Sequence, residues 1–164
     1  MRQNFIALTF LLISCFAIGQ KTKTTFLNSY WNETEKENAE YYQELTKVSS
    51  KNYKVEHYYI SGQLQMSGHY VDKKMDTEIG EFNFYDSLGN IRKTKFYVDG
   101  FLDGVQKEFY ADGTLKRSEN YSMNDRQGEY QEYYEDKSIR AEANFVDDKI
   151  RGIAQRFSID GSIV

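Results

Sequence analysis

Hydrophobic and polar positions recur with a period of 24 residues over most of the chain. Within each period the sixth position is aromatic, the twelfth is aliphatic and the eighteenth is aromatic. Because four registers agree without a gap, the pattern indicates a tandem repeat. The units are 80–103, 104–127, 128–151 and 152–164, and an earlier copy at 56–79 fits with three extra residues before Gly80. The repeat-defining glycines are Gly80, Gly104, Gly128 and Gly152 at the first position, and Gly89, Gly113 and Gly161 nine positions later.

The segment between the sixth and twelfth positions predicts a hairpin turn. Ala111-Asp112-Gly113 suits a three-residue loop, in which a type I turn is closed by a residue with positive φ. Such a loop pairs Phe109 with Leu115 across the strands, so each repeat is one β-hairpin and successive hairpins add edge to edge. Lys137 replaces the glycine in one copy, at a cost of about 1 kcal/mol. We therefore expect the 135–137 turn to be the softest or to have a different shape.

The alternation within a strand predicts which residues share a face. It places the even positions of every unit together, with each aromatic ring stacked on its copy one hairpin along. That face has too few apolar residues for a sandwich core. The expected fold is therefore all-β, an elongated single-layer antiparallel β-meander of eleven or twelve strands built from 24-residue hairpin repeats. A compact barrel of the same hairpins is the alternative.

Residues 20–55 form a capping segment whose structure is less clear from the sequence. Strands are expected at Thr24–Trp31 and Lys51–Ile60. The residues 34–37 have the form of a capping box, so a short helix from Ala39 to Lys47 is possible. The same residues also suit a strand paired with 51–60 across Ser49-Ser50, and the strand is slightly favoured.

Residues 1–19 have the pattern of a secretory signal peptide. Arg2 precedes an apolar run, and small residues lead to an expected cleavage between Gly19 and Gln20. One alternative is a lipobox that lipidates Cys15 and anchors the chain to a membrane, and another is an N-terminal core strand or helix. Cys15 is the only cysteine, so cleavage would leave a mature chain without disulfides, thiolate metal sites or cysteine nucleophiles. The expected location is periplasmic or secreted, with a membrane-anchored lipoprotein as the alternative.

Composition narrows the possible partners. Cleavage leaves 145 residues, the length of one domain, and no segment that would span a membrane. Aromatic residues make up 16% of the chain, too many for a disordered protein of this polarity. The formal charge is −4, or −5 without Arg2, which is a poor match for nucleic acid or an anionic bilayer. A protein partner is therefore expected.

Candidate chemistry is sparse. His57 and His69 would share a metal only if both faced one side, and no spacing supplies a third ligand, so two partly exposed strand histidines are the favoured interpretation. Asp112, Asp136 and Asp160 recur at the period of the repeat, as turn residues do, and no calcium-binding nonapeptide accompanies them. Motifs of the common hydrolase, nucleotide-binding and metalloprotease types are absent from the sequence. We expect neither enzymatic activity nor a cofactor.

The odd positions supply a candidate partner-binding face. They carry aromatic residues on a polar background, which is typical of recognition surfaces. These residues are Phe82, Phe84, Tyr110, Tyr130 and Tyr134. Alternatively, the sheet curls or the N-terminal segment folds over them. The strand expected at 152–159 is a possible open edge for self-association, although Arg151 and Arg156 would discourage such pairing.

The columns of glycine, aromatic residue, Asp-Gly and aliphatic residue resemble the variant MORN repeats of bacteria over 56–164. The resemblance implies a β-hairpin array that binds another macromolecule, and many such proteins carry the label of antitoxin component. Combined with export, it implies an immunity-type protein in the periplasm. Two functional classes follow: an exported, non-catalytic protein-interaction module, or a structural or envelope-associated repeat protein that self-assembles.

Overall fold

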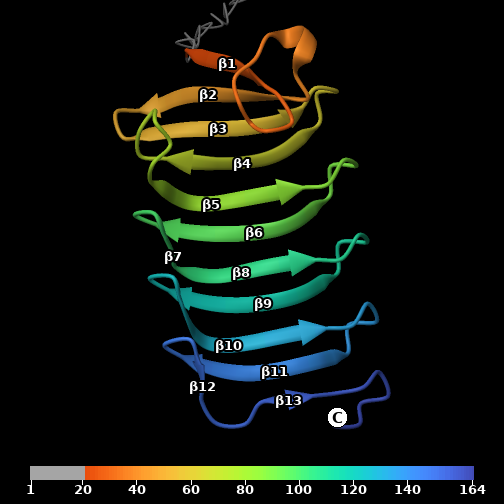
Figure 1. Ribbon diagram of the computed structural model, residues 1–164. Helices are drawn as coiled ribbons and strands as arrows, with labels where there is room; N and C mark the ends of the chain where they lie inside the picture. The colour runs from red at the N-terminus through yellow and green to blue at the C-terminus, as the bar shows by residue number, and fades with distance from the viewer. Residues whose placement is uncertain (1–20) are drawn as a thin grey trace, which may run out of the picture.

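The computed structural model describes residues 21–164, which form one open antiparallel sheet (Figure 1). The leader, its cleavage position at Gly19 and Gln20, and Cys15 lie outside the described residues. The all-β meander is confirmed, and the compact barrel is wrong. The strands are β1 (Thr22–Leu27), β2 (Tyr41–Ser49), β3 (Asn52–Tyr59), β4 (Leu64–Tyr70), β5 (Glu78–Tyr85), β6 (Ile91–Val98), β7 (Phe101–Leu102), β8 (Gly104–Phe109), β9 (Leu115–Ser122), β10 (Asp125–Tyr133), β11 (Ile139–Val146), β12 (Lys149–Ile150) and β13 (Gln155–Arg156).

The strands follow one another in chain order across the sheet. Two short strands continue into the next along the chain, β7 into β8 and β12 into β13, so the 13 strands form eleven rows. Each unit supplies one hairpin: β5 with β6, β8 with β9, and β10 with β11. The predicted hairpin repeat is therefore confirmed in these three units. Figure 1 shows the hairpins stacked into a long ladder.

The turns at one edge of the sheet have the predicted three-residue form. The Tyr110 N–H donates to the Thr114 carbonyl at 2.8 Å, and Gly113 has φ +84°. Lys137 adopts φ 71° in a turn with the same two backbone hydrogen bonds as the Gly113 turn. Of the two expectations for the 135–137 turn, the different shape is wrong, because the neighbouring strands impose one geometry on glycine and lysine alike. That this turn is the softest stays a prediction.

The turns at the other edge are two-residue turns with positive φ at both positions, the type I′ geometry that suits twisted strands. They lie at Asp99-Gly100, Met123-Asn124 and Asp147-Asp148. The second residue of each turn also bonds to the preceding repeat: the Asn124 N–H donates to the Leu102 carbonyl at 2.9 Å, and the Asp148 N–H donates to the Arg126 carbonyl at 3.2 Å. These bonds join one repeat to the next at the edge of the sheet.

A β-bulge follows each three-residue turn and changes which residues share a face of the sheet. Tyr85 pairs with Ile91 but Phe84 pairs with Lys93, so Arg92 has no partner residue. A single unpaired residue reverses the alternation in the rest of the strand. The prediction that even positions share one face throughout is therefore wrong. Face A carries positions 3, 5, 14, 16 and 18 of each unit and the residues in register with them, and face B carries positions 2, 4, 6, 12, 15 and 17.

The hydrophobic core lies on face A at the N-terminal end. Val55, Met66 and Phe82 are buried there, at 0%, 7% and 3% exposure. The Phe82 ring contacts Tyr70 and Tyr97 edge to face, at centroid distances of 5.3 and 5.1 Å. The predicted stacking of each sixth-position ring on its copy is wrong. Among the described residues, no ring pair joins the sixth-position aromatics of β5, β8 and β10.

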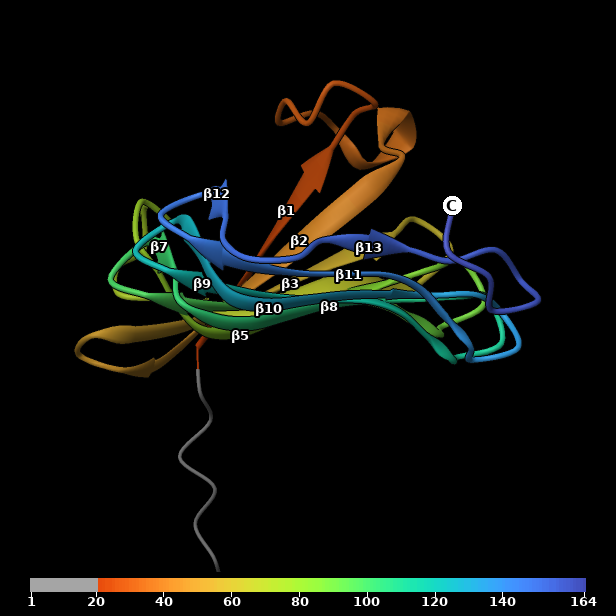
Figure 2. The same ribbon diagram turned by 90° about the horizontal axis from the view of Figure 1, so that it is seen from below.

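The N-terminal segment is a pair of strands with a folded connection. Strand β1 ends at Leu27 rather than at Trp31, and the following residues form a turn. The expected strand over the 39–47 region is confirmed as β2, while the helix is wrong: only the short 3-10 segment η1 (Lys36–Asn38) forms, and its Glu35 makes no side-chain cap. Figure 2 shows β1, β2 and η1 rising out of the plane of the other strands on one side of the sheet.

Candidate interaction face

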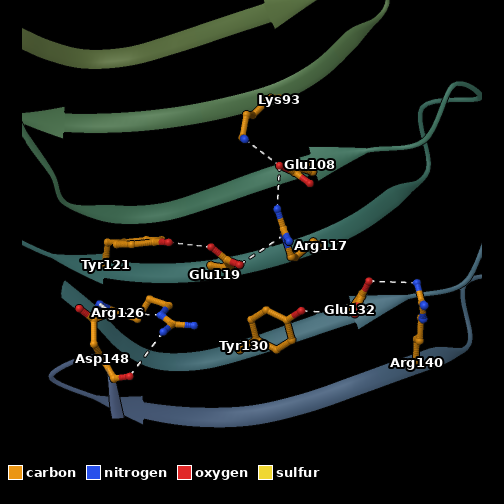
Figure 3. Close-up of polar contacts among 10 residues, drawn as sticks. All are labelled: Lys93, Glu108, Arg117, Glu119, Tyr121, Arg126, Tyr130, Glu132, Arg140 and Asp148. Carbon is orange, nitrogen blue, oxygen red and sulfur yellow. Dashed lines mark hydrogen bonds and ion pairs between the residues drawn. The ribbon is translucent and has the colours of Figure 1, made fainter. Parts of the chain in front are cut away.

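Face A carries a lattice of alternating charges over the middle of the sheet (Figure 3). Glu108 Oε1 forms ion pairs with Lys93 Nζ at 2.7 Å and with Arg117 Nη2 at 2.8 Å. Arg117 Nε lies 3.3 Å from a Glu119 oxygen. Burial opposes ionisation of Glu108, but Lys93 and Arg117 outweigh that effect and lower the pKa of its carboxyl group. The four side chains come from β6, β8 and β9, so the lattice joins two repeats.

Tyrosine hydroxyls extend the lattice on β9 and β10. The Tyr121 hydroxyl donates to Glu119 at 2.8 Å, and the Tyr130 hydroxyl donates to Glu132 at 3.3 Å. Arg140 also contacts Glu132, at 3.2 Å. Burial and the bond to Glu119 raise the pKa of Tyr121 to about 12, so its hydroxyl stays a donor near neutral pH.

The energetic role of these contacts follows from their exposure. The side chains of Lys93 and Arg117 are 39% and 35% exposed. Ion pairs of this kind contribute roughly 0–1 kcal/mol each to folding. Their main effect is therefore to hold long side chains in fixed positions, which lowers the entropy cost when a partner binds.

The C-terminal end of face A is hollowed. A hollow of about 520 Å³ has a mixed lining of arginine, glutamate and glutamine side chains with aromatic and aliphatic ones that include Tyr130, Phe145 and Ile150. The Tyr130 and Phe145 rings meet edge to face at 6.1 Å, and the Arg126 guanidinium lies 4.2 Å from the Phe145 ring centre. Arg126 is also paired with Asp148 at 3.1 Å. Apolar surface beside fixed charge is a common composition for a protein-binding site.

A second hollow, of about 400 Å³, lies at the N-terminal end of face A. Its lining is almost entirely apolar and comes from Trp31, His57, Gln65, Met66 and Phe84. The bulge reversal places His57, Met66 and Phe84 in one register row, and the turn after β1 brings Trp31 against His57 at 5.0 Å. Sequence reasoning did not find this site. The available signal was the chain's only tryptophan, Trp31, which ends the expected strand Thr24–Trp31 and is followed by polar residues.

The five aromatic residues predicted as a partner-binding face do not form one patch. Phe82 is buried in the core and is therefore not available to a partner. The bulge places Tyr97, at position 18, on the same face as Phe82, and the Tyr97 ring packs against the Phe82 ring. Phe84 lines the N-terminal hollow and Tyr130 lines the C-terminal one. The N-terminal segment reaches only the first of these hollows, through Trp31.

Tyr110 and Tyr134 have a structural role at the turns. The Tyr110 hydroxyl donates to the Tyr133 carbonyl at 2.6 Å, and the Tyr134 hydroxyl donates to the Phe157 carbonyl at 2.8 Å. Each bond reaches the sixth position of the next repeat. These two residues therefore join neighbouring repeats at the three-residue turns, and each hydroxyl group already donates a hydrogen bond within the protein.

The two histidines lie on opposite faces. His57 is on face A and bonds to Gln43 through Nε2 at 3.0 Å, whereas His69 pairs in register with Lys54 on face B and bonds to Asn52 at 2.6 Å. They are therefore not placed to share a metal. In the part of the chain that the structure describes, no group of three histidine or carboxylate side chains is positioned to hold a metal ion.

The recurring aspartates are turn residues, as the sequence predicted. Asp112 accepts a hydrogen bond from the Thr114 N–H at 2.9 Å, and Asp160 accepts one from the Ser162 N–H at 3.0 Å. Asp136 makes the same contact with Ser138. Three hydrogen bonds lower the pKa of Asp160 to about 2: one from the Ser158 hydroxyl, one from the Ser162 N–H and one from the Ser162 hydroxyl.

The C-terminal edge exposes aliphatic side chains. Only Gln155 and Arg156 of the expected 152–159 strand form β13, which pairs with β11, and Arg151 lies in the preceding connection. The exposed residues are Ile150, Ile153, Ile159, Ile163 and Val164. Within 21–164, no helix has the length and hydrophobicity needed to cross a membrane.

Comparison with known proteins supports the repeat. No curated protein matches the chain. A family model described as the MORN repeat variant matches residues 102–123 and 126–147, which correspond to the hairpins β8–β9 and β10–β11. The match therefore covers two adjacent units of this all-β ladder.

Proposed function

We propose that the protein is an exported, non-catalytic interaction module that binds a protein partner on face A. The observation that carries the proposal is the preorganised and uncovered lattice over β6–β10, flanked by two hollows with aromatic linings. Interfaces combine aromatic anchors with fixed polar groups in this way. The leader-like residues 1–19 support export, and the MORN-variant repeats are compatible with an interaction role.

A finer proposal concerns the partner. An exported repeat protein that resembles antitoxin components would act outside the cytoplasm, as an immunity-type protein that covers the active surface of a toxin. The acidic chain and its lattice of both charge signs favour a protein over nucleic acid. In this proposal a captured partner would carry a toxin-like domain, and its activity would fall in proportion to the amount of protein added.

The experiment is affinity capture with the expected mature chain, residues 20–164, from envelope and secreted fractions of the source cell. Tyr130→Ser removes a face A ring at the C-terminal hollow, and Tyr133→Ser is the matched control because it removes a ring from face B of the same strand. We expect one dominant partner that the control retains and Tyr130→Ser loses. Equal retention by both folded variants would contradict binding at this end of face A.

Self-assembly is the second candidate, because aliphatic side chains are exposed beside the short strand β13. In this case the purified chain would form oligomers that dissociate when Ile153 is replaced by lysine. Size-exclusion chromatography with light scattering measures this directly. A monomer at all concentrations would exclude self-assembly and leave the interaction module as the proposal.

A further inference from the structure

The apolar hollow at the N-terminal end of face A has a bulky aromatic residue held in a backbone conformation that normally selects glycine. Trp31 has φ 63°. Its N–H donates to the Asn28 carbonyl at 2.9 Å, and the Asn28 N–H donates to the Asn32 carbonyl at 3.0 Å. These are the bonds that surround Gly89 in the turn after β5, so Trp31 occupies the position of that glycine. A bulky side chain there is rare and is often associated with function.

The surrounding contacts hold the indole over face A. The Trp31 ring stacks on Tyr41 at 4.8 Å with an interplanar angle of 8°. Asn28 Oδ1 accepts hydrogen bonds from the N–H groups of Tyr30 and Asn32, which fixes the turn. Even so, Trp31 remains 44% exposed, and it lines the hollow together with Met66 and Phe84. The indole is therefore positioned but not buried.

A cation without a carboxylate partner stands beside this hollow. Lys95 lies opposite Phe82 in register, and its Nζ lies 5.8 Å from the centre of the Phe84 ring. Its neighbour Lys93 is paired with Glu108, whereas no described carboxylate lies within 4.0 Å of the Lys95 amine. Burial and the charge of Lys93 lower the pKa of Lys95, against the weaker opposing effects of Glu108 and Glu78. An anion bound at this position would offset both the burial of the Lys95 ammonium and its repulsion by Lys93.

We propose that the hollow binds an aromatic side chain of the protein partner and that Lys95 binds a carboxylate next to it in the partner's sequence. The proposal rests on the proposed function, since it names the kind of segment that face A recognises. Its basis is complementarity: an apolar hollow with a tryptophan wall accepts a ring, and the unpaired ammonium at its border accepts a negative charge.

Three capped dipeptides test the two halves of the site. Acetyl-Phe-Glu-amide presents both groups, acetyl-Phe-Gln-amide lacks the charge, and acetyl-Ala-Glu-amide lacks the ring. Trp31 is the only tryptophan of the chain, so its fluorescence reports on this hollow alone, and the Met66 methyl resonance gives a second signal. We expect acetyl-Phe-Glu-amide to bind about fivefold or more tightly than acetyl-Phe-Gln-amide, as a charge-assisted contact predicts, and acetyl-Ala-Glu-amide to bind more weakly than either.

A matched pair of variants assigns the charge preference. Lys95→Gln removes the proposed anion contact, and Lys107→Gln is the control because Lys107 pairs with Thr94 and Ser118 on face B. Only Lys95→Gln is expected to abolish the preference for Glu over Gln. The proposal is overturned if no dipeptide shifts the Trp31 and Met66 signals at its solubility limit. It is also overturned if the preference survives in Lys95→Gln.

These outcomes are separate from those of the proposed function. A partner captured by the wild-type chain and lost by Tyr130→Ser, together with a negative dipeptide result, would leave the interaction module intact and place its binding site at the C-terminal hollow. Dipeptide binding as predicted, with no protein captured, would support the site while contradicting the wider proposal.

Discussion

Gly68 is the position where the structure makes its sharpest stability prediction. A Cβ at this residue would lie 2.3 Å from two atoms of the Phe82 ring and 2.7 Å from a third. The ring would have to move by about 1 Å to restore ordinary contact, in an interior that is close-packed. Tyr70 and Tyr97 block that movement, since both contact the ring edge to face.

The expected cost of Gly68→Ala follows from two opposing effects. Overpacking a core costs about 1–3 kcal/mol. Gly68 does not have positive φ, so alanine also restricts the unfolded chain and returns about 0.4–1 kcal/mol. The net prediction is a loss of roughly 1–2 kcal/mol in the free energy of unfolding. Urea denaturation followed by circular dichroism and by Trp31 fluorescence measures it.

A double-mutant cycle separates the steric cause from the backbone. Phe82→Ala removes the ring, and in that background Gly68→Ala should become neutral or stabilising. Gly113→Ala is the control, because its Cβ would meet open space while its φ of +84° is strained for alanine. Its cost of about 1 kcal/mol should be the same with and without the Phe82 ring. A destabilisation by Gly68→Ala that persists in Phe82→Ala would refute the reasoning.

Three further predictions concern the turns and His57. Lys137→Gly should raise the free energy of unfolding by about 1 kcal/mol in urea denaturation, because φ 71° suits glycine, and the reverse change Gly113→Lys should lower it by a similar amount. Tyr134→Phe should cost about 0.5–1.5 kcal/mol and speed amide hydrogen exchange in the last hairpin, since the bond to the Phe157 carbonyl is lost; unchanged exchange there would contradict a joining role. Burial lowers the pKa of His57 to about 4 from 6.5, so the unfolded chain binds its proton first, and stability should fall as the pH drops from 6.5 towards 4. His57→Gln should remove that part of the pH profile, and identical profiles would show that the imidazole is not desolvated.

The sequence predicted the repeat and its three-residue turns because both leave a direct mark on residue type. A positive φ selects glycine at Gly89 and Gly113, and the aromatic and aliphatic columns fix the closing pairs Tyr85–Ile91 and Phe109–Leu115. These are local constraints, and a fixed period makes each copy confirm the others. The exception at Lys137 shows that the strands on either side determine the turn more strongly than its own residue does.

The faces could not be predicted in the same way, because one unpaired residue reverses them. The bulged position holds a basic residue in each of three units, Arg92, Lys116 and Arg140. A basic residue is ordinary at any exposed strand position, so this column does not by itself mark a bulge. Without the bulge, Tyr97 was assigned to the face opposite Phe82, although the two rings are in contact. The candidate hollow depends on the equivalent bulge at Gln65, which places Met66 opposite His57. It also depends on the path of the turn at Trp31, which contacts Tyr41 and His57.

The division of roles between edges and faces explains why Lys95, the charged part of the candidate site, lies between Phe82 and Gln106. Hydrogen bonds at the turns join neighbouring repeats, so the third position can change from buried phenylalanine to glutamine without disrupting the sheet. Gln106 is also buried, and its side chain bonds to both the N–H and the carbonyl of Phe96, at 3.0 and 3.3 Å. The apolar core therefore ends and the lattice begins within two strands. Lys95 stands at that boundary, opposite Phe82, and a partner group that is half apolar and half anionic matches it better than a purely apolar or purely charged group would.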